Sequence, residues 1–111
     1  MTDLRLLMAA LGGESACLVR VESTEGSAPR EVGAWMAVFT ARLVGTIGGG
    51  HLELQAIAEA RRRLGGVPGP AQMRYALGPA LGQCCGGVVH LGFERLTAAD
   101  LAPGAGLRAR L

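Results

Sequence analysis

The 111-residue chain has no lysine, few aromatic side chains and little net charge. All eleven basic residues are arginine, the net charge is +2, and the aromatic residues are one Trp, one Tyr and two Phe. A nucleic-acid-binding surface built from basic patches and stacking rings is therefore not expected. The sequence also lacks a run of 18 apolar residues and a basic region followed by an apolar stretch, so neither a membrane span nor a secretion signal is expected.

Cysteine is too sparse for a disulfide framework. Two of the three cysteines, Cys84 and Cys85, are adjacent, and Cys17 stands alone in an apolar segment. An odd number without paired spacing is not typical of a secreted protein, and no second Cys or His pair stands at zinc spacing. We therefore expect a cytoplasmic protein in which Cys17 is an inert core residue.

Half of the residues are apolar, which suits one small domain with a modest core. The spacing of Leu54, Ile57, Ala60 and Leu64 is typical of an amphipathic helix. The patterns predict helices over 4–11 and 52–64, and strands over 16–22, 34–40, 43–47, 72–77 and 88–96. The predicted fold is α+β, with one mixed or antiparallel sheet of about five strands packed by two helices. We assign 1–96 to this domain and 97–111 to a C-terminal linker or tail.

Three consecutive glycines, Gly48, Gly49 and Gly50, join a predicted strand to a predicted helix. Glycine permits positive φ, and bare backbone N–H groups at a helix start suit an anion or another hydrogen-bond acceptor. The pattern is neither a phosphate-binding P-loop nor a dinucleotide fingerprint, because Lys-Ser/Thr and the third spaced glycine are missing. As an isolated pattern, it is equally typical of a tight structural turn. His51 and Glu53 are candidates for ligand contact or for a capping and charge role at the helix start.

Segments 34–40 and 43–47 are predicted to pair as a β-hairpin that turns near 41–42. A hairpin places the start of its first strand and the end of its second at the same edge. The polar loop 23–33, which contains Ser27 and Arg30, is therefore expected beside the glycine turn. A hydroxyl, a guanidinium and backbone donors together suit a phosphate or another oxyanion.

The adjacent cysteines precede Gly86 and Gly87, which leave room for a group next to a thiol. Cysteine thiolate is the nucleophilic and metal-binding form of the side chain. A transient persulfide on Cys84 or Cys85 is one chemistry that this pattern permits.

Three stretches in order, 25–33, 44–53 and 85–94, resemble the XdhC/CoxI family, the accessory proteins of xanthine dehydrogenase. They contain Glu-Gly-Ser-Ala-Pro-Arg, Gly-Thr-Ile-Gly-Gly-Gly-His-Leu-Glu and Cys-Gly-Gly. The resemblance covers nearly the whole predicted domain. Members usually continue into a second, Rossmann-like domain, which is absent from the 111 residues here, and an apolar face left uncovered in this way would favour a homodimer.

The resemblance implies a chaperone for the molybdenum cofactor (molybdopterin), not an enzyme. Such a protein protects the cofactor during sulfuration and assists its insertion into the xanthine dehydrogenase apoenzyme, with a cysteine desulfurase as a second partner. The implied cofactor-binding residues are Ser27, Arg30, Gly48, Gly49, Gly50, His51, Glu53, Cys84, Cys85, Gly86 and Gly87, with Cys85 near or on the molybdenum. The alternatives are a persulfide sulfur carrier and a non-binding structural or dimerisation module.

Overall fold

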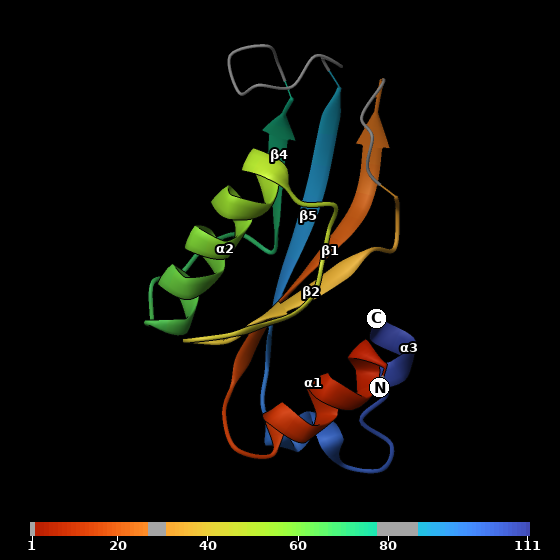
Figure 1. Cartoon of the computed structure of the whole chain (residues 1–111), viewed down its shortest axis with the longest axis vertical. Helices are drawn as coiled ribbons and strands as arrows, with labels where there is room; N and C mark the ends of the chain where they lie inside the picture. Colours follow the sequence, from red (N-terminus) through yellow and green to blue (C-terminus); the bar gives the residue numbers. More distant parts are fainter. Residues whose placement is uncertain (1, 27–30, 78–86) are drawn as a thin grey trace.

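The computed structural model describes residues 2–26, 31–77 and 87–111. A five-stranded sheet has the order β3-β2-β1-β5-β4, and its neighbouring strands are antiparallel (Figure 1). The strands are β1 Ala16–Glu25, β2 Trp35–Val38, β3 Leu43–Gly45, β4 Gln72–Ala76 and β5 Val88–Leu96. The helices are α1 Asp3–Leu11, α2 Gly50–Leu64, the 3-10 helix η2 Ala98–Leu101 and α3 Leu107–Arg110. The predicted α+β class and the strand number are confirmed, and the sheet is antiparallel.

The central strand β1 is buried on both faces because its side chains alternate between two core clusters. Cys17, Val19 and Val21 belong to the cluster beneath α2. Ala16 and Leu18 belong to the second cluster, which contains α1 and α3 residues. This period of two is the normal alternation of a strand. It places the sheet, with β1 at its centre, between the two sets of helices.

Helix α2 is amphipathic, but its buried face differs from the predicted one. Leu52, Ala56 and Ala60 are buried at intervals of four residues, while Leu54 is 65% exposed. Residues two positions apart lie about 200° apart around a helix, so Leu54 points away once Leu52 faces the sheet. The prediction that Leu54 belongs to the apolar face is wrong.

The β2–β3 hairpin is confirmed, with Met36 opposite Gly45 and the Phe39 N–H donating to the Arg42 carbonyl at 2.9 Å. The predicted end of β1 at Glu22 is wrong, because the strand continues to Glu25. Strand β5 supplies partners for this polar extension, and Glu25 lies opposite Val88. A β-bulge near Glu22 shifts the register there, which apolar alternation alone does not reveal.

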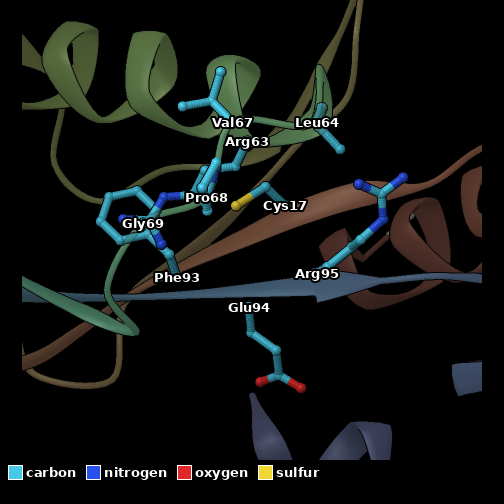
Figure 2. Close-up of a pocket in the computed structure, with 9 residues that line it drawn as sticks. All are labelled: Cys17, Arg63, Leu64, Val67, Pro68, Gly69, Phe93, Glu94 and Arg95. Carbon is cyan, nitrogen blue, oxygen red and sulfur yellow. The ribbon is translucent and has the colours of Figure 1, made fainter.

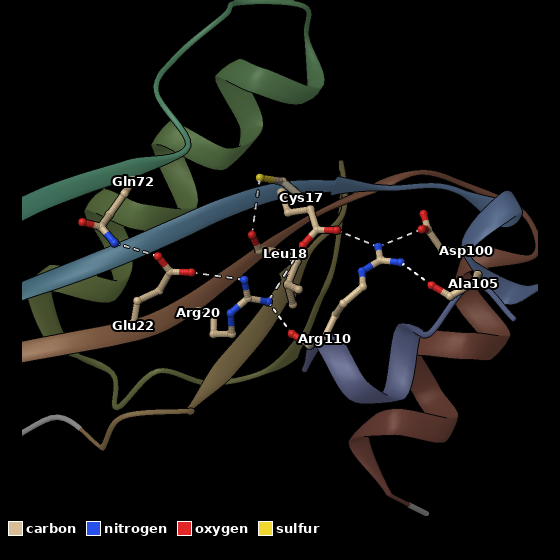
Figure 3. A network of polar contacts seen from close by, with 9 residues as sticks. Cys17, Leu18, Arg20, Glu22, Gln72, Asp100, Ala105 and Arg110 are labelled. Atoms are coloured by element: carbon tan, nitrogen blue, oxygen red, sulfur yellow. Dashed lines mark hydrogen bonds and ion pairs between the residues drawn. The ribbon is translucent and has the colours of Figure 1, made fainter.

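Residues 97–111 pack against the rest of the domain. Thr97 and Asp100 form a capping box at η2, and Leu107 is 6% exposed within the second core cluster. The Arg110 guanidinium bonds to the carboxylates of Glu94 and Asp100 (Figure 3). The segment predicted as a linker or tail therefore contributes to the core and to the polar contacts of the sheet.

Within the described residues, no helix is both long and apolar enough to span a membrane.

Candidate functional site

The described parts of the first and third sequence motifs lie side by side at one end of the sheet. Glu25 pairs with Val88, and a Cβ added to Gly26 would lie 3.5 Å from the Gly87 Cα. The Leu77 N–H donates to the Gly87 carbonyl at 2.7 Å, so the residue after β4 is also held beside Gly87. Helix α2 also starts toward this end of the sheet (Figure 1). The predicted site residues Ser27, Arg30, Cys84, Cys85 and Gly86 lie outside the described residues.

The glycine turn adopts backbone angles that only glycine adopts easily. Gly48, Gly49 and Gly50 have φ values of 117°, 76° and 72°, and α2 begins at Gly50. Side-chain-bearing residues in this region are strained, so the three glycines are required by the turn itself. The predicted strand, glycine turn and helix are therefore confirmed as local structure, and ligand contact remains a prediction.

The Glu53 carboxylate holds this turn together from the first turn of α2. Its Oε1 accepts hydrogen bonds from Thr46 Oγ1 at 2.5 Å, from the Ile47 N–H at 3.0 Å and from the Gly49 N–H at 3.2 Å. The Gly48 N–H donates to Thr46 Oγ1 at 3.0 Å. The N–H groups of Gly48 and Gly49, predicted to contact an anion, therefore have partners within the turn.

An open pocket of about 390 Å³ adjoins the glycine turn at Thr46. Asp3 of α1, the segment 31–35 and Thr46 line it. The described end of the polar loop therefore lies beside Thr46, which precedes the glycine turn, and Gly48, Gly49 and Gly50 do not line this pocket. His51 is exposed at the start of α2 and does not line this pocket among the described residues.

A second pocket of about 200 Å³ lies where the end of α2 meets β1 and β5 (Figure 2). Cys17, Arg63 and Phe93 are among its lining residues, and none of the described site residues predicted above lines it. The Arg63 guanidinium stacks over the Phe93 ring at 4.3 Å from its centroid. Burial raises the pKa of the Cys17 thiol to about 11. The prediction that Cys17 is a core residue is confirmed, since it is 2% exposed.

We expect Cys17 to resist alkylation in the folded protein. With a pKa of about 11, its thiolate fraction at pH 8 is lower than that of an ordinary cysteine by about 100-fold. Iodoacetamide labelling followed by peptide mass spectrometry should therefore modify Cys17 at least about 100-fold faster in urea than in buffer. Comparable rates in both solutions would contradict this expectation.

Strand pairing also brings together His90 and Glu25, neither of which is among the predicted site residues. His90 Nε2 lies 2.6 Å from Glu25 Oε2, and the hydrogen bond from His90 holds the pKa of the Glu25 carboxyl below its usual range. Arg74 lies opposite His90 on β4. The pair links β1 and β5 just before Gly26 and just after Gly87. The alternation of residues along β5 does not reveal this contact, because the partner of His90 is 65 residues away.

A polar network continues along the same strands (Figure 3). The Glu22 carboxylate accepts hydrogen bonds from Gln72 at 2.8 Å and from Arg20 at 3.1 Å, and the bond from Gln72 is the main reason that its pKa is lowered. A Cβ on Gly92 would overlap the Glu22 carboxylate. Among the residues that the structure describes, no group of three or more His, Cys, Asp or Glu side chains could hold a metal ion.

Comparison with protein families matches residues 9–76 to the XdhC and CoxI family. A crystal structure of a xanthine dehydrogenase from Bacillus halodurans is similar to this chain, with a TM-score of 0.67 and 26% sequence identity. The similarity covers 86% of this chain and 30% of that one, so this chain spans less than a third of the length of that relative. No curated protein matches the chain.

Proposed function

Because this chain belongs to the XdhC and CoxI family, we propose that it is a molybdenum cofactor-binding chaperone for a xanthine dehydrogenase. It holds the molybdopterin cofactor during sulfuration and then assists its insertion into the apoenzyme. The family is linked to maturation of xanthine dehydrogenase, and this supports an accessory role in place of catalysis. The proposed protein partners are the apoenzyme and a cysteine desulfurase in the cytoplasm, with a homodimer as the proposed assembly.

The observation that carries this proposal is that the family motifs contact one another in pairs. Gly26 lies against Gly87, so the first and third motifs are in contact at one end of the sheet. Glu31, Val32 and Gly33, at the end of the first motif, share a pocket with Thr46 of the second. Loops that meet on a rigid sheet form the usual setting for a ligand site.

The described residues fit one part of the cofactor better than the others. The pocket at Thr46 offers a half-buried indole, a hydroxyl and two carboxylates, which suit the hydrogen-bonding pterin edge. When bound, the cofactor supplies the molybdenum centre on which oxo and sulfur ligands are exchanged. The contact proposed for molybdenum is Cys85, a thiolate ligand of the soft kind that such a metal accepts.

The burial of Cys17 bears on the sulfur-carrier alternative. A carrier needs a thiolate that is accessible to its sulfur donor, whereas Cys17 is 2% exposed and has a pKa of about 11. A persulfide role would therefore depend on Cys84 or Cys85. Mass spectrometry after incubation with a cysteine desulfurase tests it by the mass of one added sulfur.

The proposed function is tested by retention of the cofactor on the full chain. Molybdenum cofactor released under anaerobic conditions is mixed with the protein, and molybdenum is measured across the gel-filtration profile. We expect molybdenum to elute with the protein and to be lost in Cys85→Ala, whereas Glu14→Gln, at an exposed residue outside the predicted site, serves as the control and should retain it. Absence of molybdenum from the folded wild-type peak would overturn the proposal, and equal retention by both variants would remove Cys85 from the site.

A further inference from the structure

The pocket between α1 and the hairpin has an unusual lining for a protein expected to hold an anionic cofactor. Asp3 and Glu31 line it, and within the described part of the chain neither carboxylate has an ion pair or a hydrogen-bonded partner. None of its described lining residues is basic. Phosphate or molybdate would meet two like charges here, which disfavours binding at this position. A neutral or cationic group that carries N–H donors has the complementary chemistry.

The backbone of residues 31–34, which forms the Glu31 side of the pocket, is held to strand β1 by hydrogen bonds. The Ala34 N–H donates to the Glu31 carbonyl at 3.1 Å, and the Gly33 N–H donates to the Val21 carbonyl at 2.9 Å. The Val21 N–H in turn donates to the Ala34 carbonyl at 2.8 Å. A fixed wall lowers the ordering cost of binding.

Trp35 gives the pocket an aromatic surface. It is half-buried, packs partly against the second core cluster and is the only Trp in the chain. An indole offers a flat, rigid contact for another planar ring. The pocket volume of about 390 Å³ lies at the lower end of the usual range for small-molecule sites, roughly 300–1,000 Å³.

We infer that this pocket receives the 2-amino-4-oxopyrimidine edge of a pterin, with Glu31 accepting its adjacent N–H donors and Trp35 contacting its ring. A carboxylate has two oxygens that match two parallel N–H groups, as in its pairing with a guanidinium. The inference rests on the proposed function, and it assigns the pterin end of the cofactor to the pocket at Thr46. The two carboxylates among its described lining residues disfavour the phosphate and the metal centre at this end of the site.

The single Trp makes the test direct, because a ¹H–¹⁵N spectrum of the chain has one indole signal. The full chain is titrated with pterin (2-amino-4-oxopteridine) and separately with lumazine, the same ring with an oxo group in place of the 2-amino group. We expect pterin to shift the Trp35 signal saturably and to bind about tenfold more tightly than lumazine, since one donor to a charged acceptor is lost. Glu31→Gln should remove this discrimination, and Glu14→Gln, an exposed residue paired with Arg42, should retain it.

Three outcomes would overturn the inference: equal affinity for pterin and lumazine, unchanged discrimination in Glu31→Gln, and a saturable Trp35 shift with inorganic phosphate but not with pterin. Gel filtration with the whole cofactor separates this result from the proposed function. Retained cofactor without pterin discrimination refutes the pocket assignment alone. Pterin discrimination without cofactor retention refutes the chaperone proposal and leaves a pterin site.

Discussion

Replacing Glu53 with alanine is expected to lower the free energy of unfolding by about 3 kcal/mol and to disorder the glycine turn. The substitution removes the acceptor of hydrogen bonds from Thr46 Oγ1 and from the N–H groups of Ile47 and Gly49. A hydrogen bond to a charged group contributes roughly 1.5–3 kcal/mol, and part of that loss is recovered where water replaces the carboxylate. Urea denaturation followed by circular dichroism measures the change.

Two further substitutions make the Glu53 prediction specific. Glu53→Gln keeps one carbonyl oxygen that accepts from the turn, so we expect about half of the destabilisation. Gln55→Ala changes a polar residue of the same helix that has no hydrogen bond to a described side chain, and it should change stability by less than about 0.5 kcal/mol. If Glu53→Ala is as mild as Gln55→Ala, the carboxylate does not hold the turn.

Faster hydrogen exchange at the Ile47 and Gly49 amides in Glu53→Ala would show that the loss is local to the turn. The same variant should retain less molybdenum cofactor if the proposed function is correct, because the turn lies beside the pocket at Thr46. Glu53 would then act on binding through the shape of the turn.

The predicted elements that were correct all depend on local patterns. The hairpin follows from two apolar segments with a two-residue connection, and α2 follows from helical spacing closed by Gly65 and Gly66. The glycine turn was predictable because glycine permits positive φ, and Gly48, Gly49 and Gly50 all have a positive φ. Each of these signals lies within a window of about 15 residues.

The features that sequence reasoning missed depend on contacts between distant segments. Ser23, Thr24 and Glu25 have no apolar alternation, and they are strand residues because β5 pairs with them. Glu31 and Asp3 share a pocket although 28 positions separate them, and one chain carries no signal for that proximity. Trp35 carried one usable signal, since the only Trp lies two residues after the polar loop 23–33.

A second large loss of stability is expected for Gly45→Ala, at the end of β3. A Cβ there would lie 2.7 Å from the Trp35 carbonyl oxygen, and the φ of 81° is itself strained for alanine. The positive φ costs roughly 1–2 kcal/mol and the close contact with backbone adds roughly 1–3 kcal/mol, so we expect about 3 kcal/mol in total. Thermal or urea unfolding measures it.

Gly104→Ala separates the two causes, because Gly104 has a φ of 86° and no atom within 4 Å of an added Cβ. It should cost only the strain, about 1–2 kcal/mol. Gly12→Ala, at the right-handed C-cap of α1 with φ of −62°, should be nearly neutral. The order Gly45, Gly104, Gly12 therefore follows from geometry, and equal losses at Gly45 and Gly104 would show that the hairpin absorbs the extra methyl group. Because the added Cβ would meet the Trp35 carbonyl, Gly45→Ala should also shift the indole signal, which Gly104→Ala should leave in place.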